Sequence, residues 1–243
     1  MSALTPTASG VVILAGRGSR MRLSPEIQKC ALDVGDRPLF AYLLEQFLRL
    51  PLCRISLVLG SGADHAWSVH RRMVDKRSEP LPVPIGVHHD RDAHGSASSV
   101  RVAVAANDNA VLYGTPTAAV SLRAWRTVLE RHDPVRFDAT LIASRDPEIA
   151  GHPVVVAGHD DVAASIAPAA SDRSAGAWRL VGGGLLSGRV IGEMSGSMSA
   201  WLGRHLADHP GRVQVVRASR VMHFATPADF EARRSGQLLE LTR

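Results

Sequence analysis

The chain has 243 residues, 45% of them hydrophobic, and 28 Lys and Arg against 23 Asp and Glu give it a net charge of +5. This length suits one sizeable α/β domain with a buried core, and the composition excludes a disordered chain. No apolar run approaches the roughly 20 residues of a membrane-spanning helix, and residues 1–9 lack the pattern of a secretory signal. Cys30 and Cys53 do not make a disulfide framework, so we expect a cytoplasmic protein.

The excess of basic residues does not indicate a nucleic-acid-binding protein. Only Lys29 and Lys76 are lysines, so arginine fills nearly all basic positions, and the arginines are scattered along the chain. No aromatic residues alternate with them, as a surface that stacks bases would require. A high isoelectric point alone is weak evidence for such a partner. We therefore expect the arginines to occupy ordinary surface positions.

Apolar runs alternate with segments of helical periodicity along the whole chain. Runs rich in Val, Ile and Leu predict buried strands, and i, i+3, i+4 spacing predicts helices. In chain order, we expect a strand at 10–15, a helix at 38–50, strands at 55–60 and 85–88 with a helix at 64–76 between them, a helix at 96–106, a strand at 110–113, a helix at 122–132, strands at 138–144, 154–156 and 180–181 with a small-residue stretch at 163–177, a helix at 198–206, a strand at 213–216 and a helix at 227–239. This alternation predicts a mostly parallel sheet covered on both faces. We expect a single three-layer αβα, Rossmann-like domain over residues 1–243.

A glycine-rich turn, residues 16–21 (GRGSRM), directly follows the first expected strand. It lacks the third glycine of the dinucleotide fingerprint, and no lysine follows at the P-loop spacing. Gly16 and Gly18 would let backbone N–H groups approach an anion, and Arg20 and Lys29 would add positive charge. These donors suit a triphosphate, whose departing pyrophosphate needs neutralising. A plain glycine turn at the end of a strand is the alternative.

Residues 12–47, VILAGRGSRMRLSPEIQKCALDVGDRPLFAYLLEQF, resemble the sugar-phosphate nucleotidylyltransferase family, with its signature L-A-A-G-x-G-x-R…P-K-P…V-x-G-x-P-L. The resemblance implies a GT-A-like nucleotidyltransferase domain whose glycine loop wraps a nucleoside triphosphate. It implies catalytic roles for Arg20 and Lys29 at the phosphates. The nucleotide-binding residues would be Leu14, Ala15, Gly16, Gly18, Ser19, His89, Gly95 and Ser96.

Weaker matches to this family continue in order along the chain. Residues 94–100 are similar to a segment near the nucleobase, 111–115 to a strand ending in G-D, 181–185 to V-N-A-G-[IL] and 224–227 to I-G-T-P. The resemblance implies an enzyme of sugar nucleotide biosynthesis. It would condense a nucleoside triphosphate with a sugar 1-phosphate or a similar small phosphorylated acceptor, giving a nucleotide-linked product and pyrophosphate. No apolar seam nominates an interface, so a homo-oligomer stays open.

The resemblance breaks where the family holds its metal ion. The family's aspartate in G-D matches Thr115, and the aspartate before I-G-T-P matches His223. Such chemistry normally uses Mg²⁺ held by carboxylates. A threonine hydroxyl brings no charge, and a neutral histidine suits Mn²⁺ or Zn²⁺ better than Mg²⁺. We expect Mg²⁺ or Mn²⁺ as cofactor with unknown ligands, and keep as an alternative a pseudoenzyme that serves as a nucleotide-binding or partner-binding subunit.

A few other residues could carry chemistry. Asp90, Asp92 and Asp108 are candidate substitutes for the missing carboxylates. The segment 88–94 (HHDRDAH) is either a metal site or a solvated loop. Cys30 is expected to be a small buried filler, although a lysine neighbour could lower the pKa of its thiol. No serine has the G-x-S-x-G context of a hydrolase.

Overall fold

A computed structural model describes most of the chain. The described residues are 8–16, 27–60, 62–75, 80–90, 95–105, 108–149, 151–158, 160–167, 177–232 and 237–242. Within them, one sheet has nine strands: β1 (Ala8–Leu14), β4 (Leu52–Leu59), β5 (Ile85–His89), β6 (Ala110–Gly114), β8 (Ala139–Ser144), β9 (Val154–Ala157), β10 (Ala163–Ala167), β11 (Arg179–Ser187) and β12 (Val213–Ala218). The path β10-β9-β11-β6-β1-β4-β5 is extended by β8, which pairs with β11 and β12.

The central strands of this sheet are mostly parallel. β1 pairs in parallel with β4 and β6, β4 with β5, and β8 with β12, whereas β11 runs antiparallel to both β6 and β8. Because the parallel strands share one direction, their carboxyl ends meet at a single edge of the sheet, and β11 begins at that same edge. This edge is where open α/β sheets place their ligand sites.

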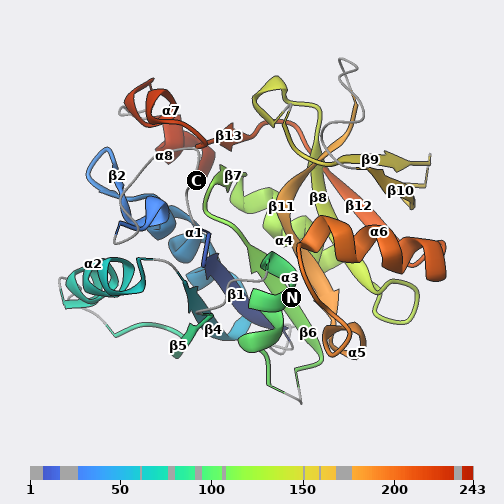
Figure 1. Ribbon diagram of the computed structural model, residues 1–243, viewed down its shortest axis with the longest axis horizontal. Coiled ribbons are helices and arrows are strands. Elements are labelled where there is room, and N and C mark those ends of the chain that lie inside the picture. Colours follow the sequence, from blue (N-terminus) through green and yellow to red (C-terminus); the bar gives the residue numbers. More distant parts are fainter. Residues whose placement is uncertain are drawn as a thin grey trace, which may run out of the picture.

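Helices cover both faces of the sheet, which confirms the expected three layers (Figure 1). The helices are α1 (Leu39–Leu48), α2 (Ala63–Asp75), α3 (Ser96–Val102), α4 (Leu122–Arg131), α5 (Gly188–Ile191), α6 (Met198–Asp208), α7 (Pro227–Ala232) and α8 (Gln237–Thr242). Side chains of α1, α2 and α4 share one buried apolar cluster with one face of the strands, and those of α3, α5 and α6 share a second cluster with the other face. No helix in the described ranges is long and apolar enough to cross a membrane.

Short elements beside α1 form a smaller unit that the apolar pattern does not predict. They are the pairs β2 (Asp33–Val34) with β3 (Arg37–Pro38) and β7 (Ala118–Ala119) with β13 (Met222–His223). With α7 and α8 they bury a third apolar cluster that includes Tyr42, Phe224 and Phe230. Where one helix was expected at 227–239, the structure describes two, α7 and α8. The small-residue stretch at 163–177 begins with strand β10.

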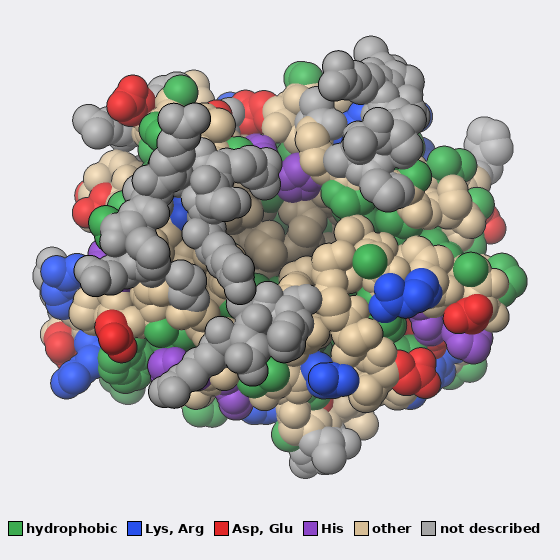
Figure 2. Space-filling view, in the orientation of Figure 1, with side chains coloured by type: hydrophobic (Ala, Val, Ile, Leu, Met, Phe, Trp, Pro, Cys, Tyr) green, Lys and Arg blue, Asp and Glu red, His purple; other side chains and the backbone are tan. Residues whose placement is uncertain are grey.

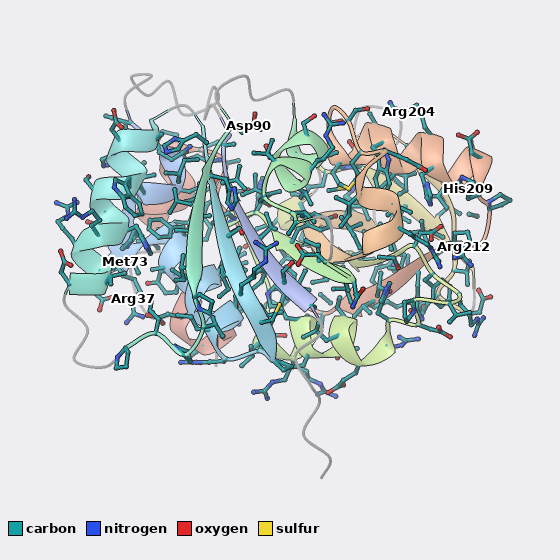
Figure 3. The ribbon with its side chains drawn as sticks, turned by 90° about the horizontal axis from the view of Figure 1, so that it is seen from below. Arg37, Met73, Asp90, Arg204, His209 and Arg212 are labelled. Atoms are coloured by element: carbon teal, nitrogen blue, oxygen red, sulfur yellow. The ribbon has the colours of Figure 1, made fainter. Side chains whose placement is uncertain are left out.

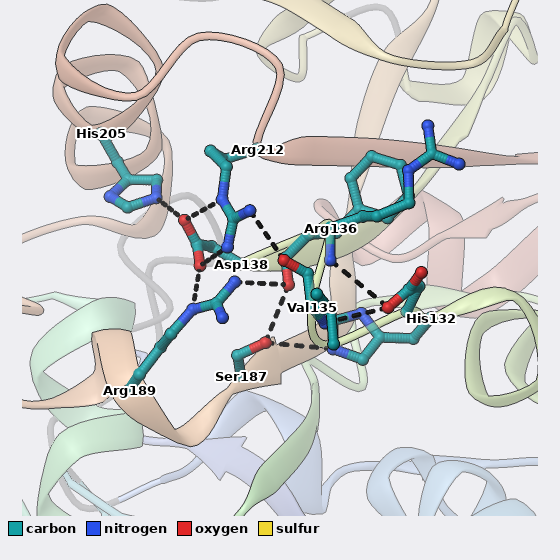
Figure 4. Close-up of polar contacts among 10 residues, drawn as sticks. His132, Val135, Arg136, Asp138, Ser187, Arg189, His205 and Arg212 are labelled. Atoms are coloured by element: carbon teal, nitrogen blue, oxygen red, sulfur yellow. Dashed lines mark hydrogen bonds and ion pairs between the residues drawn. The ribbon is translucent and has the colours of Figure 1, made fainter.

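A network of charged side chains connects α5, α6 and the turn before β12 at the opposite edge of the sheet, where β8 and β12 begin (Figure 4). The buried carboxylate of Asp138 accepts hydrogen bonds from Arg189 Nε (2.5 Å), from Nε and Nη2 of Arg212 (both 3.2 Å) and from His205 Nε2 (3.0 Å). The partners come from α5, α6 and the turn before β12. Since Arg189 and Arg212 compensate the charge of Asp138, the network serves the fold rather than a ligand.

Candidate functional site

Residues expected to bind a nucleotide converge at the carboxyl edge of the sheet. Gly16 is exposed just beyond β1, and Thr115 follows β6 directly. β6 pairs with β1 on one side, and on the other side Gly114 lies opposite Gly183 of β11. The end of β1, the end of β6 and Gly182 are therefore on three adjacent strands.

The glycine turn is described only at its start. Leu14 and Ala15 are buried, with exposed fractions of 0% and 4%, so their side chains belong to the core and only their backbone can line a site. Gly18, Ser19 and Arg20, which were expected to bind phosphate, lie outside the described residues.

The side chain of Gln28 forms hydrogen bonds with the backbone where the glycine turn begins. Its side-chain Nε2 donates hydrogen bonds to the carbonyl oxygens of Leu14 and Gly16, and its Oε1 accepts one from the backbone N–H of Cys30. The side chain is buried, at 2% exposure. Gln28 therefore holds the backbone at the end of β1, from Leu14 to Gly16.

Lys29 begins the 3₁₀ turn η2 (Lys29–Ala31) and reaches the same edge of the sheet. Its Nζ donates a hydrogen bond to the carbonyl oxygen of Phe224 at 3.0 Å, and the backbone N–H of Phe224 donates to the carbonyl of Thr117 at 2.8 Å. The cation is thereby held close to the turn after β6. Burial raises the pKa of the neighbouring Cys30 thiol to about 11, so it is protonated near neutral pH, as a buried filler should be.

Thr115 bonds to the start of β11. Its backbone N–H and its Oγ1 both donate to the carbonyl oxygen of Gly182, at 3.1 Å and 3.2 Å. Gly182 has φ +85°, and a Cβ there would lie 2.7 Å from Thr115 Oγ1. This approach needs glycine at 182 because larger residues avoid that backbone conformation and would collide with the hydroxyl.

His223 is paired with His152. The two Nε2 atoms lie 3.0 Å apart, and His152 Nδ1 lies 2.7 Å from the carbonyl oxygen of Leu180. The rings meet edge to face, with an interplanar angle of 88° and centroids 4.5 Å apart. The backbone N–H of His223 donates to Glu148 Oε2 at 3.0 Å. Two imidazoles and a carboxylate thus gather at a position where the resemblance leads one to expect a single aspartate.

The two positions matched to the family's metal ligands do not fit Mg²⁺. Mg²⁺ takes oxygen ligands in near-octahedral geometry, usually with carboxylates. Thr115 offers an uncharged hydroxyl that donates to a carbonyl, and His223 offers a ring nitrogen. In the described ranges, no group of three or more His, Cys, Asp and Glu side chains is placed to hold a metal ion.

The other carboxylates considered from sequence have structural partners. Asp90, at the end of β5 near the top of Figure 3, is buried and accepts a 2.6 Å hydrogen bond from Ser99 Oγ. Asp108 pairs with Arg54. Asp92 lies outside the described residues. The carboxylates of Asp90 and Asp108 thus make contacts within the fold.

In the segment that was expected near the nucleobase, residues at the beginning of α3 contact residues at the beginning of α6. His89 is exposed at the end of β5. Gly95 has φ +125° and packs against the backbone of Gly196, while Ser96 Oγ accepts a hydrogen bond from the N–H of Met198 at 3.0 Å. These contacts bring the first turns of α3 and α6 together at the carboxyl edge of the sheet.

A small cavity of about 160 Å³ lies among these elements. It is lined by Ser96, Tyr113, Leu141, His152, Pro153, Leu180, Gly182, Gly183, Ser197, Met198 and Ser199. Figure 2 shows this face of the molecule hollowed near its middle, with histidine side chains at the rim. Its lining thus includes Ser96, Gly182, which bonds to Thr115, and His152, which lies against His223.

A larger cavity, of about 530 Å³, lies between α1 and α2. Arg37 and Met73, which line it, lie on the flank of the molecule near α2 (Figure 3). It contains none of the residues expected to bind the nucleotide. We therefore place the functional site at the smaller cavity, whose lining includes Ser96 together with Gly182 and His152, the partners of Thr115 and His223.

Two residues at the site were missed by the sequence analysis. Gln28 stands between the glycine turn and Lys29, but no local pattern predicts that its amide turns back to β1. His152 precedes an expected strand, and its approach to His223 depends on the pairing of Arg179 with Val154 and of His223 with Ala118. A histidine directly before the strand at 154–156 was the only available signal.

Comparisons with known proteins identify the domain family. The model of the MobA-like NTP transferase domain matches residues 10–186. No curated protein matches the sequence significantly.

Several solved structures share the fold. An inositol-1-phosphate CTP transferase from T. maritima is 14% identical, with 98% of each chain covered and a TM-score of 0.74. A candidate glucose-1-phosphate thymidylyltransferase from Bacillus anthracis is 13% identical, with 96% of this chain and 99% of that chain covered and a TM-score of 0.73. HddC from Yersinia pseudotuberculosis is 18% identical, covering 93% and 97%, with a TM-score of 0.69. At these identities the likenesses establish the fold alone.

Proposed function

The chain belongs to the family of MobA-like NTP transferase domains, and we propose that it is an active nucleotidyltransferase. It would transfer a nucleotide from a nucleoside triphosphate to a small phosphorylated acceptor, such as a sugar 1-phosphate or a cyclitol phosphate, and release pyrophosphate. The observation that carries the proposal is the position of Lys29. Its ammonium is held beside the end of β6, at the edge where the glycine turn leaves β1.

The proposed reaction is a displacement at the α-phosphorus. A phosphate oxygen of the acceptor forms a bond to that phosphorus, and the bond to the bridging oxygen of pyrophosphate breaks, so that the leaving group takes the electron pair. Backbone N–H groups of the glycine turn would bind the triphosphate. Arg20 and Lys29 would neutralise the charge that develops on the departing pyrophosphate. No step is assigned to a metal ion.

The acceptor would lie in the small cavity. Its volume of about 160 Å³ suits a compact molecule, and Ser96, Ser197, Ser199 and His152 supply polar groups among its apolar lining residues. The structural neighbours' names refer to inositol 1-phosphate and glucose 1-phosphate. Both are phosphorylated polyols, and we propose this class for the acceptor.

The second candidate is a catalytically degenerate family member that binds a nucleotide or a partner. The observation that favours it is the absence of a carboxylate side chain at both Thr115 and His223, whose polar atoms bond within the protein. The fold would then be kept for binding alone.

Pyrophosphate release separates the two candidates. The assay would take each of ATP, CTP, GTP, UTP and dTTP with inositol 1-phosphate or glucose 1-phosphate, in Mg²⁺ and separately in Mn²⁺. If the wild type releases pyrophosphate only when both substrates are present, the result supports an active enzyme. Release by a Thr115→Asp, His223→Asp double variant alone indicates a decayed site. Release from neither protein contradicts the activity with this acceptor class.

A further inference from the structure

We propose that His152 and His223 together bind a divalent cation of borderline softness (Mn²⁺, Co²⁺ or Zn²⁺) in preference to Mg²⁺. The imidazole nitrogen suits these ions, while Mg²⁺ favours oxygen. The site goes beyond the proposed function, because the protein should bind the ion whether or not it turns over a nucleotide.

The spacing of the two nitrogens fits one shared ion. Two ring nitrogens that bind the same metal at right angles, each about 2.1 Å from it, lie about 3.0 Å apart. The Nε2 atoms of His152 and His223 are 3.0 Å apart. The ring centroids are only 4.5 Å apart, which is closer than rings joined head-on through these nitrogens would be. The rings therefore meet at an angle, as two neighbouring ligands of one ion do.

The hydrogen bond on the far side of His152 sets its tautomer. Nδ1 lies 2.7 Å from the carbonyl oxygen of Leu180, and a carbonyl only accepts, so Nδ1 carries the proton. In the neutral ring Nε2 then keeps a lone pair, which faces His223. Histidines that bind metals commonly donate their other N–H to a carbonyl or carboxylate, which fixes the ring. In the protein without metal, His223 Nε2 donates to that lone pair. When an ion binds, this proton would move to Nδ1 of His223, so that both Nε2 atoms offer lone pairs to the ion.

The surrounding backbone holds both rings in place. Arg179 Nη1 donates to the carbonyl of His152 at 3.0 Å, and Glu148 Oε2 accepts from the backbone N–H of His223. Glu148 also adds negative charge near the pair. His223 is 9% exposed, whereas His152 lines the small cavity. The cavity is therefore the side from which an ion would approach the pair.

The pair supplies only two protein ligands. Because the described ranges contain no larger group of His, Cys, Asp and Glu placed for a metal, the remaining positions on the ion would be filled by water or by phosphate oxygens of a ligand in the cavity. We therefore expect binding that a chelator reverses and that a phosphorylated ligand strengthens.

Co²⁺ titration of the tag-free full-length protein tests the site, with absorption of the bound ion as the readout. The wild type should bind Co²⁺, and Mn²⁺ or Zn²⁺ should displace it at concentrations where Mg²⁺ does not. His152→Gln and His223→Gln should each weaken binding at least tenfold. His209→Gln, which changes an exposed histidine at the other edge of the sheet, is the matched control and should bind like the wild type.

A second measurement uses the wild type alone, in case a variant does not fold. Addition of Zn²⁺ should shift the ring ¹⁵N resonances of two histidines: His152 should keep its Nδ1 proton, and the proton of His223 should move from Nε2 to Nδ1. Unchanged resonances, or folded variants that bind Co²⁺ like the wild type, would overturn the proposal. Nucleotide binding measured in EDTA reports on the proposed function separately, so the two can fail independently.

Discussion

The ammonium of Lys29 donates a 3.0 Å hydrogen bond to the carbonyl oxygen of Phe224, which lies 195 residues further along the chain. The bond joins the turn η2, after the glycine loop, to the segment that follows β13. Phe224 is itself bonded to Thr117, so the cation is fixed against the strand end where Thr115 begins the next turn. The positive charge is thereby held at the edge of the sheet where the parallel strands end, which is where open α/β sheets bind ligands.

Replacement of Lys29 should therefore affect chemistry more than stability. We expect Lys29→Ala to lower turnover about 100-fold or more, as loss of one donor to developing charge does at other sites. The lost hydrogen bond should cost only about 1 kcal/mol of unfolding free energy. Pyrophosphate release and urea unfolding measure the two effects, with exposed Arg123→Ala as the control. Wild-type turnover in Lys29→Ala would refute the role of Lys29.

Gln28 should act on nucleotide binding through the glycine turn. Gln28→Ala frees the carbonyl groups of Leu14 and Gly16, so we expect KM for the nucleotide to rise about tenfold with a smaller change in kcat. Removing this donor from the buried carbonyl of Leu14 should cost about 1–3 kcal/mol. Steady-state kinetics at varied nucleotide concentration measures the change in KM.

Gln46 offers a matched control for this effect. It is also a buried glutamine, and its Nε2 donates to the carbonyl of Val120 at 2.8 Å while its Oε1 accepts from Trp125. Gln46→Ala should lose comparable stability and keep the wild-type KM. An equal rise in KM in both variants would mean that Gln28 is merely structural.

The double variant Thr115→Asp, His223→Asp should change the preferred metal. Two carboxylates replace a hydroxyl and an imidazole, and carboxylates favour Mg²⁺. We expect Mg²⁺ to raise the melting temperature of the double variant more than that of the wild type, and Zn²⁺ to raise it less. Each single variant should show an intermediate change. Identical metal responses in the wild type and the double variant would show that neither position contacts the ion.

His132 should make the protein less stable in mild acid. Burial lowers the pKa of its ring, whose Nδ1 lies 2.8 Å from Thr140 Oγ1 and whose Nε2 lies 3.2 Å from Ser187 Oγ (Figure 4). The unfolded chain, with a histidine pKa of about 6.5, then binds a proton that the folded protein excludes. The contribution of His132 is fully present above that pH, and the unfolding free energy falls as the pH drops below it.

Urea unfolding at pH 7.5 and pH 5.0 tests this sign. His132→Gln cannot titrate, so its loss of stability between the two pH values should be smaller than that of the wild type. Some loss should persist, because burial also lowers the pKa values of His70 and His88. His209→Gln should behave like the wild type. A larger loss in His132→Gln would contradict the assignment.

The central layers could be predicted from sequence because their signals are local. Apolar runs and helical spacing gave β1, α1, β4, α4 and β12 within a few residues. The two-residue strands β2, β3, β7 and β13 were missed, since so short a pairing leaves no periodicity. β11 was expected only at 180–181 because its run of glycines hides a nine-residue strand, whose antiparallel direction depends on its neighbours.

The same distinction between local and long-range signals applies to the residues of the site. The glycine turn and Lys29 follow one another closely in the chain, so a local motif indicates them. The histidine pair joins residues 71 positions apart through the pairing of β9 with β11 and of β13 with β7. No sequence spacing could foretell that contact, and the same holds for the return of Gln28 to β1.

Thermal melting with nucleotides tests the account most directly. The protein would be melted with each of ATP, CTP, GTP, UTP and dTTP at millimolar concentration, in EDTA, Mg²⁺, Mn²⁺ and Zn²⁺, with Lys29→Ala in parallel. A nucleotide at 100 times its Kd adds about 2.7 kcal/mol to the unfolding free energy. We predict that at least one nucleotide raises the melting temperature of the wild type and that Lys29→Ala reduces this rise. No shift with any nucleotide under any of these conditions would contradict the account.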